Sequence, residues 1–275
     1  MSADSLAEEA LQRGLPLLQP TDVNDPTVVA SLRACAPDLL VLAGYSPILT
    51  QPLLGLASHG CINLHGGRLP QYRGSSPMNW ALINGEKEFT ISIVQADAGV
   101  DTGAVLHERT FPISIDDTIV DLQRTANQVF PDMLLDVIRD IQSGTVHARP
   151  QDESQAAYYP LRFPDDGLIL WDLYSAEQVH NRIRALTSPY PGAFTFFNGR
   201  RVTLLRSKLA RQQRYGEPGR VYLKNEHGLL VCARDRCLWI QQAVFDDSQT
   251  DAADAIERYG KFATIRDSAV AHLMV

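Results

Sequence analysis

The chain has 275 residues, of which 45% are hydrophobic and 21% charged, and its formal net charge is −7. These values are typical of a globular protein and exclude a disordered or low-complexity chain. No apolar run approaches the ~20 residues of a membrane-spanning helix, and the acidic N-terminus lacks an apolar signal segment. We therefore expect a cytoplasmic protein with no membrane partner, and the length favours two domains.

Helical and strand-like patterns alternate over the first 145 residues. Asp25-Pro26 predicts a helix start, because an Asp side chain caps free N–H groups and Pro suits the first turn. The apolar run 39–43 predicts a strand buried on both faces. Helices are expected at 6–13, 26–35, 77–84, 118–143 and from the turn 44–47 to about 56, and further strands at 15–18, 61–64, 89–94 and 104–113. This order predicts a parallel α/β domain.

The predicted secondary structure changes in the second half of the chain. Residues 146–190 hold Pro150, Pro160 and Pro164 and are expected to form a linker followed by a connecting helix at 175–186. Residues 191–275 are β-like, with Asn198-Gly199 as a hairpin signal. The expected strands are 193–197, 202–205, 219–223, 228–233 and 238–243. Short strands with turns predict a small barrel, so the domains are 1–145 and 191–275.

The four cysteines form no C-x-x-C pair, so neither a zinc site nor a redox motif is indicated. Cys35 and Cys61 lie in apolar sequence and are predicted to be buried, reduced thiols. His59, Cys61 and His65 would share one face of a strand, but a fourth ligand is missing nearby. We expect no metal.

Positive charge is concentrated in one segment. Residues 182–220 hold nine Lys and Arg against one acid, Glu217, for a net charge of +8 inside an acidic chain. Such a block suggests a phosphate-bearing partner. A hairpin edge protected by basic residues is an equal alternative.

An amide, an imidazole and a carboxylate follow strand ends in the first half. Asn63 and His65 are spaced i, i+2, which puts both on one face of a strand, and Asp101 lies in the glycine-containing segment 97–103. Ligands bind at the carboxyl ends of strands in open α/β sheets, so the three residues are expected to meet at one rim. An Asn donates to an oxyanion, a His exchanges protons, and an Asp orients that His.

These residues favour direct transfer without a covalent enzyme intermediate. No Ser or Cys nucleophile is placed in the motif, so the attacking group would come from the substrate, for example an amine. For each residue alone, a structural role in its loop is the stronger alternative. Three together among glycines favour catalysis.

The segment 62–74, then Pro77 and Asp101-Thr102-Gly103, resembles the formyltransferase family that uses 10-formyltetrahydrofolate. The similarity continues through Tyr159-Pro160, Asp165-Asp166-Gly167, Trp171, the turn 188–192 and Gly219-Arg220-Val221, and so covers nearly the whole chain. It implies a Rossmann-like α/β catalytic domain and a small C-terminal OB-like β-barrel domain. Family members begin with a strand, a helix and a strand that have no counterpart before residues 6–13.

The resemblance implies that Asn63, His65 and Asp101 are the catalytic trio and that 10-formyltetrahydrofolate is the co-substrate. Two loops would form the pocket for its pterin ring, through Gly44, Tyr45, Ser46, Pro47, Ile48, Ala96, Asp97 and Val100. Contacts to the acceptor would come from residues that follow the trio, namely Arg68, Tyr72, Arg73, Gly74, Asn79 and Trp80.

Motif details around Asn79-Trp80 and Asp165-Asp166-Gly167 resemble the family members that formylate nucleotide-linked amino sugars. An acidic chain also suits tRNA poorly, because RNA binding depends on many Lys and Arg contacts to phosphates. We therefore expect an amino sugar as acceptor. Methionyl-tRNA, water (a hydrolase) and a catalytically silent folate-binding protein are the alternatives, and the small barrel offers a surface for a homodimer.

Overall fold

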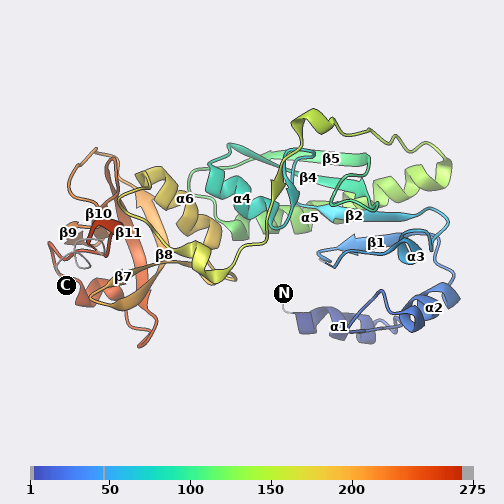
Figure 1. Cartoon of the computed structure of the whole chain (residues 1–275), viewed down its shortest axis with the longest axis horizontal. Helices are drawn as coiled ribbons and strands as arrows, with labels where there is room; N and C mark the ends of the chain where they lie inside the picture. The colour runs from blue at the N-terminus through green and yellow to red at the C-terminus, as the bar shows by residue number, and fades with distance from the viewer. Residues whose placement is uncertain (1–2, 46, 268–275) are drawn as a thin grey trace.

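The computed structural model describes residues 3–45 and 47–267. The first part of the chain forms a four-stranded sheet with helices around it, and the last part forms a five-stranded sheet beside it along the long axis of the molecule (Figure 1). A two-stranded ribbon links the parts. These elements agree with the expected Rossmann-like domain followed by a small antiparallel β domain.

The N-terminal sheet is mixed rather than parallel. Only its first two strands are parallel, and the remaining pairs are antiparallel. Their order is β1 (Leu40–Ala43), β2 (Cys61–His65), β4 (Glu88–Gln95) and β5 (Val105–Pro112). The expectation of an all-parallel sheet is therefore wrong. One reason is that β4 and β5 are joined by only the loop 96–104, whereas a parallel crossover needs a dozen or more residues.

Strand β1 is an edge strand with one covered face. Leu40 and Leu42 pack on the cluster of Val29 and Leu53, while Val41 is 39% exposed. The prediction that this run is buried on both faces is wrong, because nothing in the described residues covers the Val41 side. The segment 15–18 is not a strand either. Pro16 lies within it and Pro20 follows it, and each lacks the N–H that a ladder needs.

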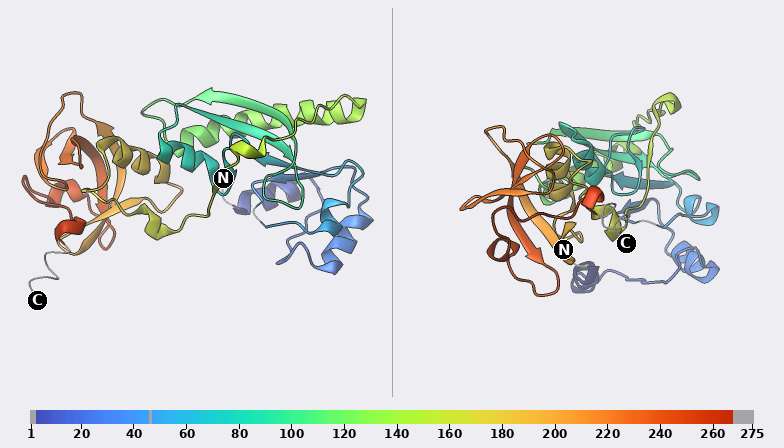
Figure 2. Two further views of the ribbon diagram at one scale, coloured as in Figure 1. Left: turned by 45° about the horizontal axis from the view of Figure 1, so that its top comes forward. Right: turned by 60° about the vertical axis from the view of Figure 1, so that its left-hand side comes forward.

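Five helices accompany this sheet: α1 (Ala3–Gln12), α2 (Pro26–Ala34), α3 (Gln51–Leu54), α4 (Pro77–Asn84) and α5 (Ile119–Ser143). Asp25 accepts a hydrogen bond from Thr27 N at 2.8 Å, which confirms the predicted cap of α2. The third helix is a single turn and shorter than expected. Figure 2 shows α1 and α2 on the opposite side of the sheet from the long α5.

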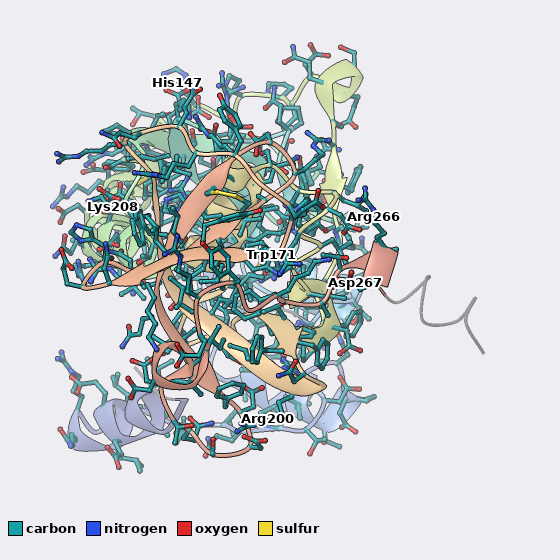
Figure 3. All side chains as sticks on the ribbon, turned by 90° about the vertical axis from the view of Figure 1, so that its left-hand side faces the viewer. His147, Trp171, Arg200, Lys208, Arg266 and Asp267 are labelled. Atoms are coloured by element: carbon teal, nitrogen blue, oxygen red, sulfur yellow. A yellow bond between two sulfur atoms is a disulfide. The ribbon has the colours of Figure 1, made fainter. Side chains whose placement is uncertain are left out.

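The C-terminal strands follow the predicted order with shifted bounds: β7 (Ala193–Phe197), β8 (Arg200–Leu209), β9 (Val221–Asn225), β10 (Gly228–Cys232) and β11 (Cys237–Phe245). The sheet order is β7-β8-β11-β10-β9, all antiparallel, with the short helix α7 (Ala252–Ala255) against β11. Asn198 and Gly199 both have positive φ, which confirms the predicted tight hairpin. Trp171 stacks on Phe262 inside this domain (Figure 3).

The connecting segment forms the junction between the two sheets. Strand β6 (Tyr158–Tyr159) pairs in parallel with β3 (Arg73–Gly74), and short 3-10 turns lie at Glu153–Gln155 and Pro164–Gly167. Helix α6 (Ala176–Leu186) packs on both α4 and β8. One buried apolar cluster includes Ile91 of the first sheet and Leu204 of the second. The two parts therefore share a continuous core.

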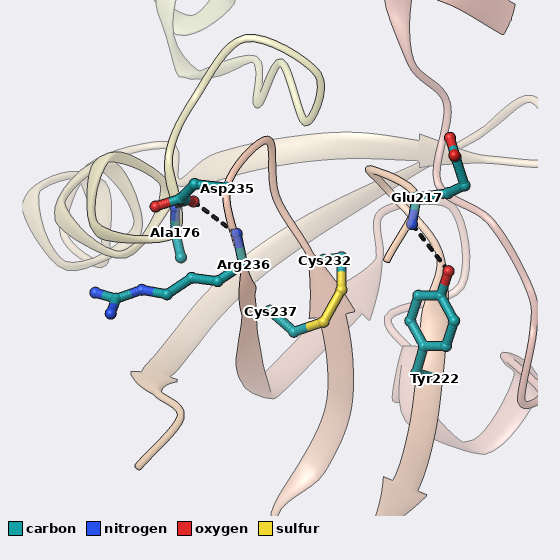
Figure 4. The surroundings of a disulfide bond; sticks show 7 residues. All are labelled: Ala176, Glu217, Tyr222, Cys232, Asp235, Arg236 and Cys237. Carbon is teal, nitrogen blue, oxygen red and sulfur yellow. Dashed lines mark hydrogen bonds between the residues drawn. A yellow bond between two sulfur atoms is a disulfide. The ribbon is translucent and has the colours of Figure 1, made fainter. Parts of the chain in front are cut away.

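The cysteines differ from expectation. Cys61 is buried as predicted, but Cys35 is exposed, because it follows the last turn of α2 on the outer side. A disulfide joins Cys232 and Cys237, which face each other in β10 and β11 (Figure 4). Among the described residues, no helix has the length and apolar character that a membrane crossing requires.

Candidate active site at the rim of the N-terminal sheet

The structure brings Asn63, His65 and Asp101 together. Asn63 and His65 project from one face of β2, and Asp101 reaches them from the loop between β4 and β5. Asn63 Nδ2 donates to Asp101 Oδ1 at 3.2 Å, and His65 Nδ1 lies 3.5 Å from the same oxygen. The sequence expectation of one shared rim is therefore met by the geometry.

Asp101 is held on every side. Its φ of +54° is a left-handed conformation that non-glycine residues rarely adopt, so the surrounding contacts must fix it. Its Oδ2 accepts from Gly74 N at 2.9 Å, and Gln151 Nε2 donates to the backbone carbonyls of Asp101 and Gly103, both at 2.7 Å. The carboxylate is consequently presented to Asn63 and His65 in one orientation.

The tautomer of His65 follows from its partners. The side chain is 5% exposed, and Nε2 donates to the Tyr72 carbonyl at 2.6 Å, so this nitrogen carries a proton. The other nitrogen, Nδ1, faces Asp101. A Cβ at Gly67 would lie 2.8 Å from Nε2 and 2.7 Å from Pro77 Cβ, so glycine is required for this close approach. Nδ1 is the nitrogen available for proton exchange with a substrate.

A buried arginine lies beneath the Asp101 loop. Arg73 is 0% exposed and donates to Gln151 Oε1, both oxygens of Glu153 and the Tyr158 hydroxyl. The hydrogen bonds to Glu153 are the main cause that raises the pKa of Arg73. Since Gln151 also holds the Asp101 backbone, this network joins the linker to the loop that carries Asp101.

The other residues predicted to contact the acceptor lie in different settings. Tyr72 is buried, and its hydroxyl donates to Glu86 Oε1 at 2.6 Å. Its ring stacks on the Tyr159 ring with 4.8 Å between the ring centres. Burial raises the pKa of the Tyr72 hydroxyl. Trp80 donates to the Pro160 carbonyl. Asn79 is buried and donates to Ala185 O, which joins α4 to α6 away from the trio. Arg68 lies at the surface near Glu88.

A cleft of about 440 Å³, within the size range of small-molecule sites, lies between the amino end of β2 at residues 59–61 and the loop residues Thr102 and Gly103 that follow Asp101. Asn63, His65 and Asp101 do not line it. Ala96 and Asp97 line it, as do Gln95, Thr102, Gln151 and Glu153. Asp97 Oδ1 accepts from Gly99 N and from Thr102 Oγ1, which shapes the loop 97–103. The mixture of amides, acids and apolar groups suits a flat ring rich in donors and acceptors.

The rest of the predicted pterin pocket is open to solvent. Gly44, with positive φ, starts a surface loop in which Tyr45 is 41% exposed and Ile48 69% exposed, and Pro47 is also exposed. Val100 is 44% exposed. Ser46 lies outside the described residues. Their contacts to a folate stay predictions.

Sequence reasoning missed Gln151 and Glu153, which it assigned to a linker. They lie 50 or more residues from Asp101 and 78 or more from Arg73, so no local pattern connects them. The one available signal was Arg73 itself, because an arginine in a predicted buried motif needs an acid partner. Within the described residues no group of His, Cys, Asp and Glu could hold a metal.

Curated relatives identify the kind of enzyme. Methionyl-tRNA formyltransferase from Desulfotalea psychrophila is 38% identical over 237 residues, which are 86% of this chain and 72% of the relative. The enzyme of that name from Anaeromyxobacter sp. (strain K) is 38% identical over 90% of this chain and 81% of the relative. These relatives contradict the expectation of a nucleotide-linked amino sugar as acceptor.

The motif details on which that expectation was based, at Asn79-Trp80 and Asp165-Asp166-Gly167, lie inside the regions that the general family models match, so their presence does not separate one acceptor from another. Solved structures give the same fold with less sequence similarity. The methionyl-tRNA formyltransferase from Clostridium thermocellum has a TM-score of 0.58 at 21% identity, over 76% of this chain and 87% of that one. The N-formyltransferase from Helicobacter canadensis, solved with folinic acid and dTDP-3-aminofucose, has a TM-score of 0.66 at 18% identity, over 86% and 82%.

The family model for formyl transferase matches residues 3–138, and the model for the formyl transferase C-terminal domain matches residues 163–259. The first match holds Asn63, His65 and Asp101, and the second begins after β6 and holds α6 and the whole second sheet. With relatives of this similarity, the chain belongs to the formyltransferase family, whose enzymes transfer formyl groups from 10-formyltetrahydrofolate.

Proposed function

We propose that this chain transfers the formyl group of 10-formyltetrahydrofolate to the amino group of methionyl-tRNA. The observation that carries the proposal is the set of methionyl-tRNA formyltransferases that are 35–38% identical over 85–90% of the chain. The buried, hydrogen-bonded arrangement of Asn63, His65 and Asp101 supports the transfer chemistry.

In the proposed reaction, a neutral amine attacks the formyl carbon. Asn63 Nδ2 donates to the oxygen that gains negative charge. The amine loses one proton to His65 Nδ1, and Asp101 compensates the positive charge that then develops on the imidazole. The bond from the formyl carbon to the folate nitrogen breaks, and His65 Nδ1 gives the proton it took from the amine to that nitrogen, which returns the imidazole to its neutral form. His65 Nε2 takes no part, because the Tyr72 carbonyl holds it.

The cleft that adjoins the loop after Asp101 is the proposed site of the folate. Ala96 offers an apolar surface and Gln95 an amide for the pterin ring, and the loop 97–103 lines one side. The Gln151 amide, already bonded to Arg73 and to the loop carbonyls, holds that side in place. The loop 44–48, part of which lies outside the described residues, completes the proposed pocket. When bound there, the co-substrate supplies the activated formyl carbon.

Part of the basic segment supports an RNA partner. Arg206, Lys208, Arg211 and Arg214 are exposed, and none has a carboxylate within ion-pair distance among the described residues. Arg200 and Arg201 are instead paired with Asp247 and Asp246. Figure 3 shows Lys208 and Arg200 at separate edges of the domain. Unpaired basic side chains favour phosphate contacts even where the net charge is negative.

The test is a formylation assay with purified protein, 10-formyltetrahydrofolate and methionyl-tRNA, followed by mass spectrometry of the aminoacyl group. Formylmethionine is the expected product. Release of formate without an acceptor would favour a hydrolase, and folate binding without turnover would favour a silent binding protein. Either result would overturn the proposal.

A further inference from the structure

Arg162 lies in the connecting segment between the two sheets, three residues after Tyr159, the last residue of β6. The carbonyl of Pro160 accepts from Trp80 Nε1 at 3.2 Å, which holds the segment against α4. The Arg162 guanidinium lies 6.0 Å from the Trp80 ring centre and 5.8 Å from that of Tyr190. Both rings are at the outer limit of a cation–π contact, so they stabilise the charge only weakly.

The guanidinium has no polar partner. Its Nε is fully buried without a hydrogen-bond acceptor, and no carboxylate pairs with the group among residues 3–45 and 47–267. Asp166, whose charge acts on it, accepts instead from Phe163 N at 2.7 Å. Burial lowers the pKa of Arg162. The residue as a whole is half-buried, and only Nε is fully enclosed. The two terminal nitrogens have no partner in the described chain, so they are free to bind an anion from outside it.

The position is close to the catalytic trio. Ser75 N donates to the Tyr159 carbonyl at 2.9 Å, and the neighbouring Gly74 N donates to Asp101. Tyr159 also stacks on Tyr72, whose carbonyl accepts from His65. A chain of three residues spans at most about 10 Å. A ligand held by Arg162 would therefore lie next to a ligand that reacts at the trio.

The surface around Arg162 is open and combines apolar side chains with the exposed acids Asp165 and Asp166. Leu161 and Phe163 are 61% and 63% exposed, and Tyr158 is 57% exposed. Single-stranded RNA ends are bound by such side chains, which contact bases, together with arginines, which contact phosphates. A small anion would not need the flanking apolar groups.

We propose that Arg162 binds a backbone phosphate in the single-stranded acceptor end of the tRNA, beside the aminoacyl group that reacts at Asn63, His65 and Asp101. This inference rests on the proposed function. The competing source of negative charge is the carboxylate tail of the folate, and the experiment separates the two. Arg162 is a positioning residue and takes no part in the chemistry.

The experiment compares Arg162→Gln and Arg162→Lys with the unaltered chain, and uses Arg139→Gln as the matched control. Arg139 is 71% exposed on α5, away from the junction. Steady-state formylation is measured with each substrate varied in turn, and the KM for methionyl-tRNA is followed against salt concentration. Thermal unfolding checks that each variant is folded.

For Arg162→Gln we expect the KM for methionyl-tRNA to rise about tenfold, with the KM for 10-formyltetrahydrofolate unchanged. The slope of log KM against log salt should fall by about 0.7, the value for one lost contact to a single-stranded phosphate. Arg162→Lys should keep that slope, because it keeps the charge. The melting temperature should not fall, whereas a purely structural arginine would destabilise the protein when removed.

An unchanged KM for methionyl-tRNA and an unchanged salt slope in Arg162→Gln would overturn the inference while the proposed function stands. A rise confined to the KM for folate would also overturn it and assign Arg162 to the folate tail. If the unaltered chain does not formylate methionyl-tRNA, the proposed function fails, and this inference fails with it.

Discussion

Two arginines in neighbouring regions have opposite surroundings. Arg73, beneath the catalytic loop, makes five hydrogen bonds to Gln151, Glu153 and Tyr158. Arg162, at the junction of the two sheets, makes none in the described chain and lies only near aromatic rings. The first cation is satisfied by the protein, and the second is not.

The two arginines illustrate two roles of a charged side chain. A fully bonded network fixes a conformation, and here it holds the strained Asp101 in place through Gln151. An unsatisfied charge has unused donors, which a ligand can occupy. The catalytic rim is thus preorganised by the fold, whereas the junction and the exposed basic side chains are proposed to be completed by the substrate.

The largest expected effect is at the rim. Asp101→Asn keeps the shape of the side chain but removes the charge that compensates His65, so the turnover rate should fall by about 10²–10⁴-fold with little change in melting temperature. Single-turnover formylation measures it. Asp136→Asn on α5 is the control. A rate within tenfold of the unaltered chain would contradict the assignment of the trio.

The free energy of unfolding tests the contrast between Arg73 and Arg162. Arg73→Gln removes hydrogen bonds to a charged group and should lower the free energy of unfolding by about 1.5–3 kcal/mol. Arg162→Gln should change it by less than about 0.5 kcal/mol, since no bond is lost. Urea unfolding compares the two variants. Equal losses would mean that Arg162 is also a structural residue.

A smaller effect is expected on the second sheet. The double change Arg206→Gln with Lys208→Gln removes two exposed, unpaired cations, and should raise the KM for methionyl-tRNA severalfold and flatten its salt dependence. Arg200→Gln, which breaks a surface pair with Asp247, is the comparison. If both variants weaken tRNA binding equally, the absence of an acidic partner does not mark the basic side chains that bind tRNA.

The smallest effect concerns a buried histidine in the satisfied part of the junction. His180 on α6 donates from Nε2 to Ile115 O and contacts Ser207 through Nδ1. Burial lowers its pKa below 6.5, the hydrogen bond to Ile115 O opposes this shift, and the charges of Arg184, Asp116 and Glu177 have smaller effects. Because the unfolded chain binds this proton first, stability is fully present above pH 6.5 and declines as the pH falls below it.

His180→Gln keeps a donor and an acceptor but cannot titrate. The variant should therefore show a flatter dependence of the unfolding free energy on pH between 7 and 5. Denaturant unfolding at several pH values measures the slope. An unaltered slope would assign the pH dependence to other groups.

The sequence by itself determined several local elements and the family, and it placed Asn63 and His65 on one face of a strand. The Asp25 cap, the Asn198-Gly199 hairpin and the spacing of Asn63 and His65 depend on neighbours within a few residues, so patterns predict them. The family also follows from ordered motifs. The proposed domain boundaries near 145 and 190 remain predictions, and the shared core between the sheets shows why composition alone defines them poorly.

Only the tertiary structure decided the strand directions, the exposure of Val41 and Cys35, and the partners of the charged groups. Whether Arg73 is satisfied and Arg162 is not depends on residues about 80 positions apart in the first case and on three separate segments in the second. Burial and hydrogen-bond pairing are properties of the packed chain. A local sequence pattern does not specify which residue from a distant segment will pack against a given side chain.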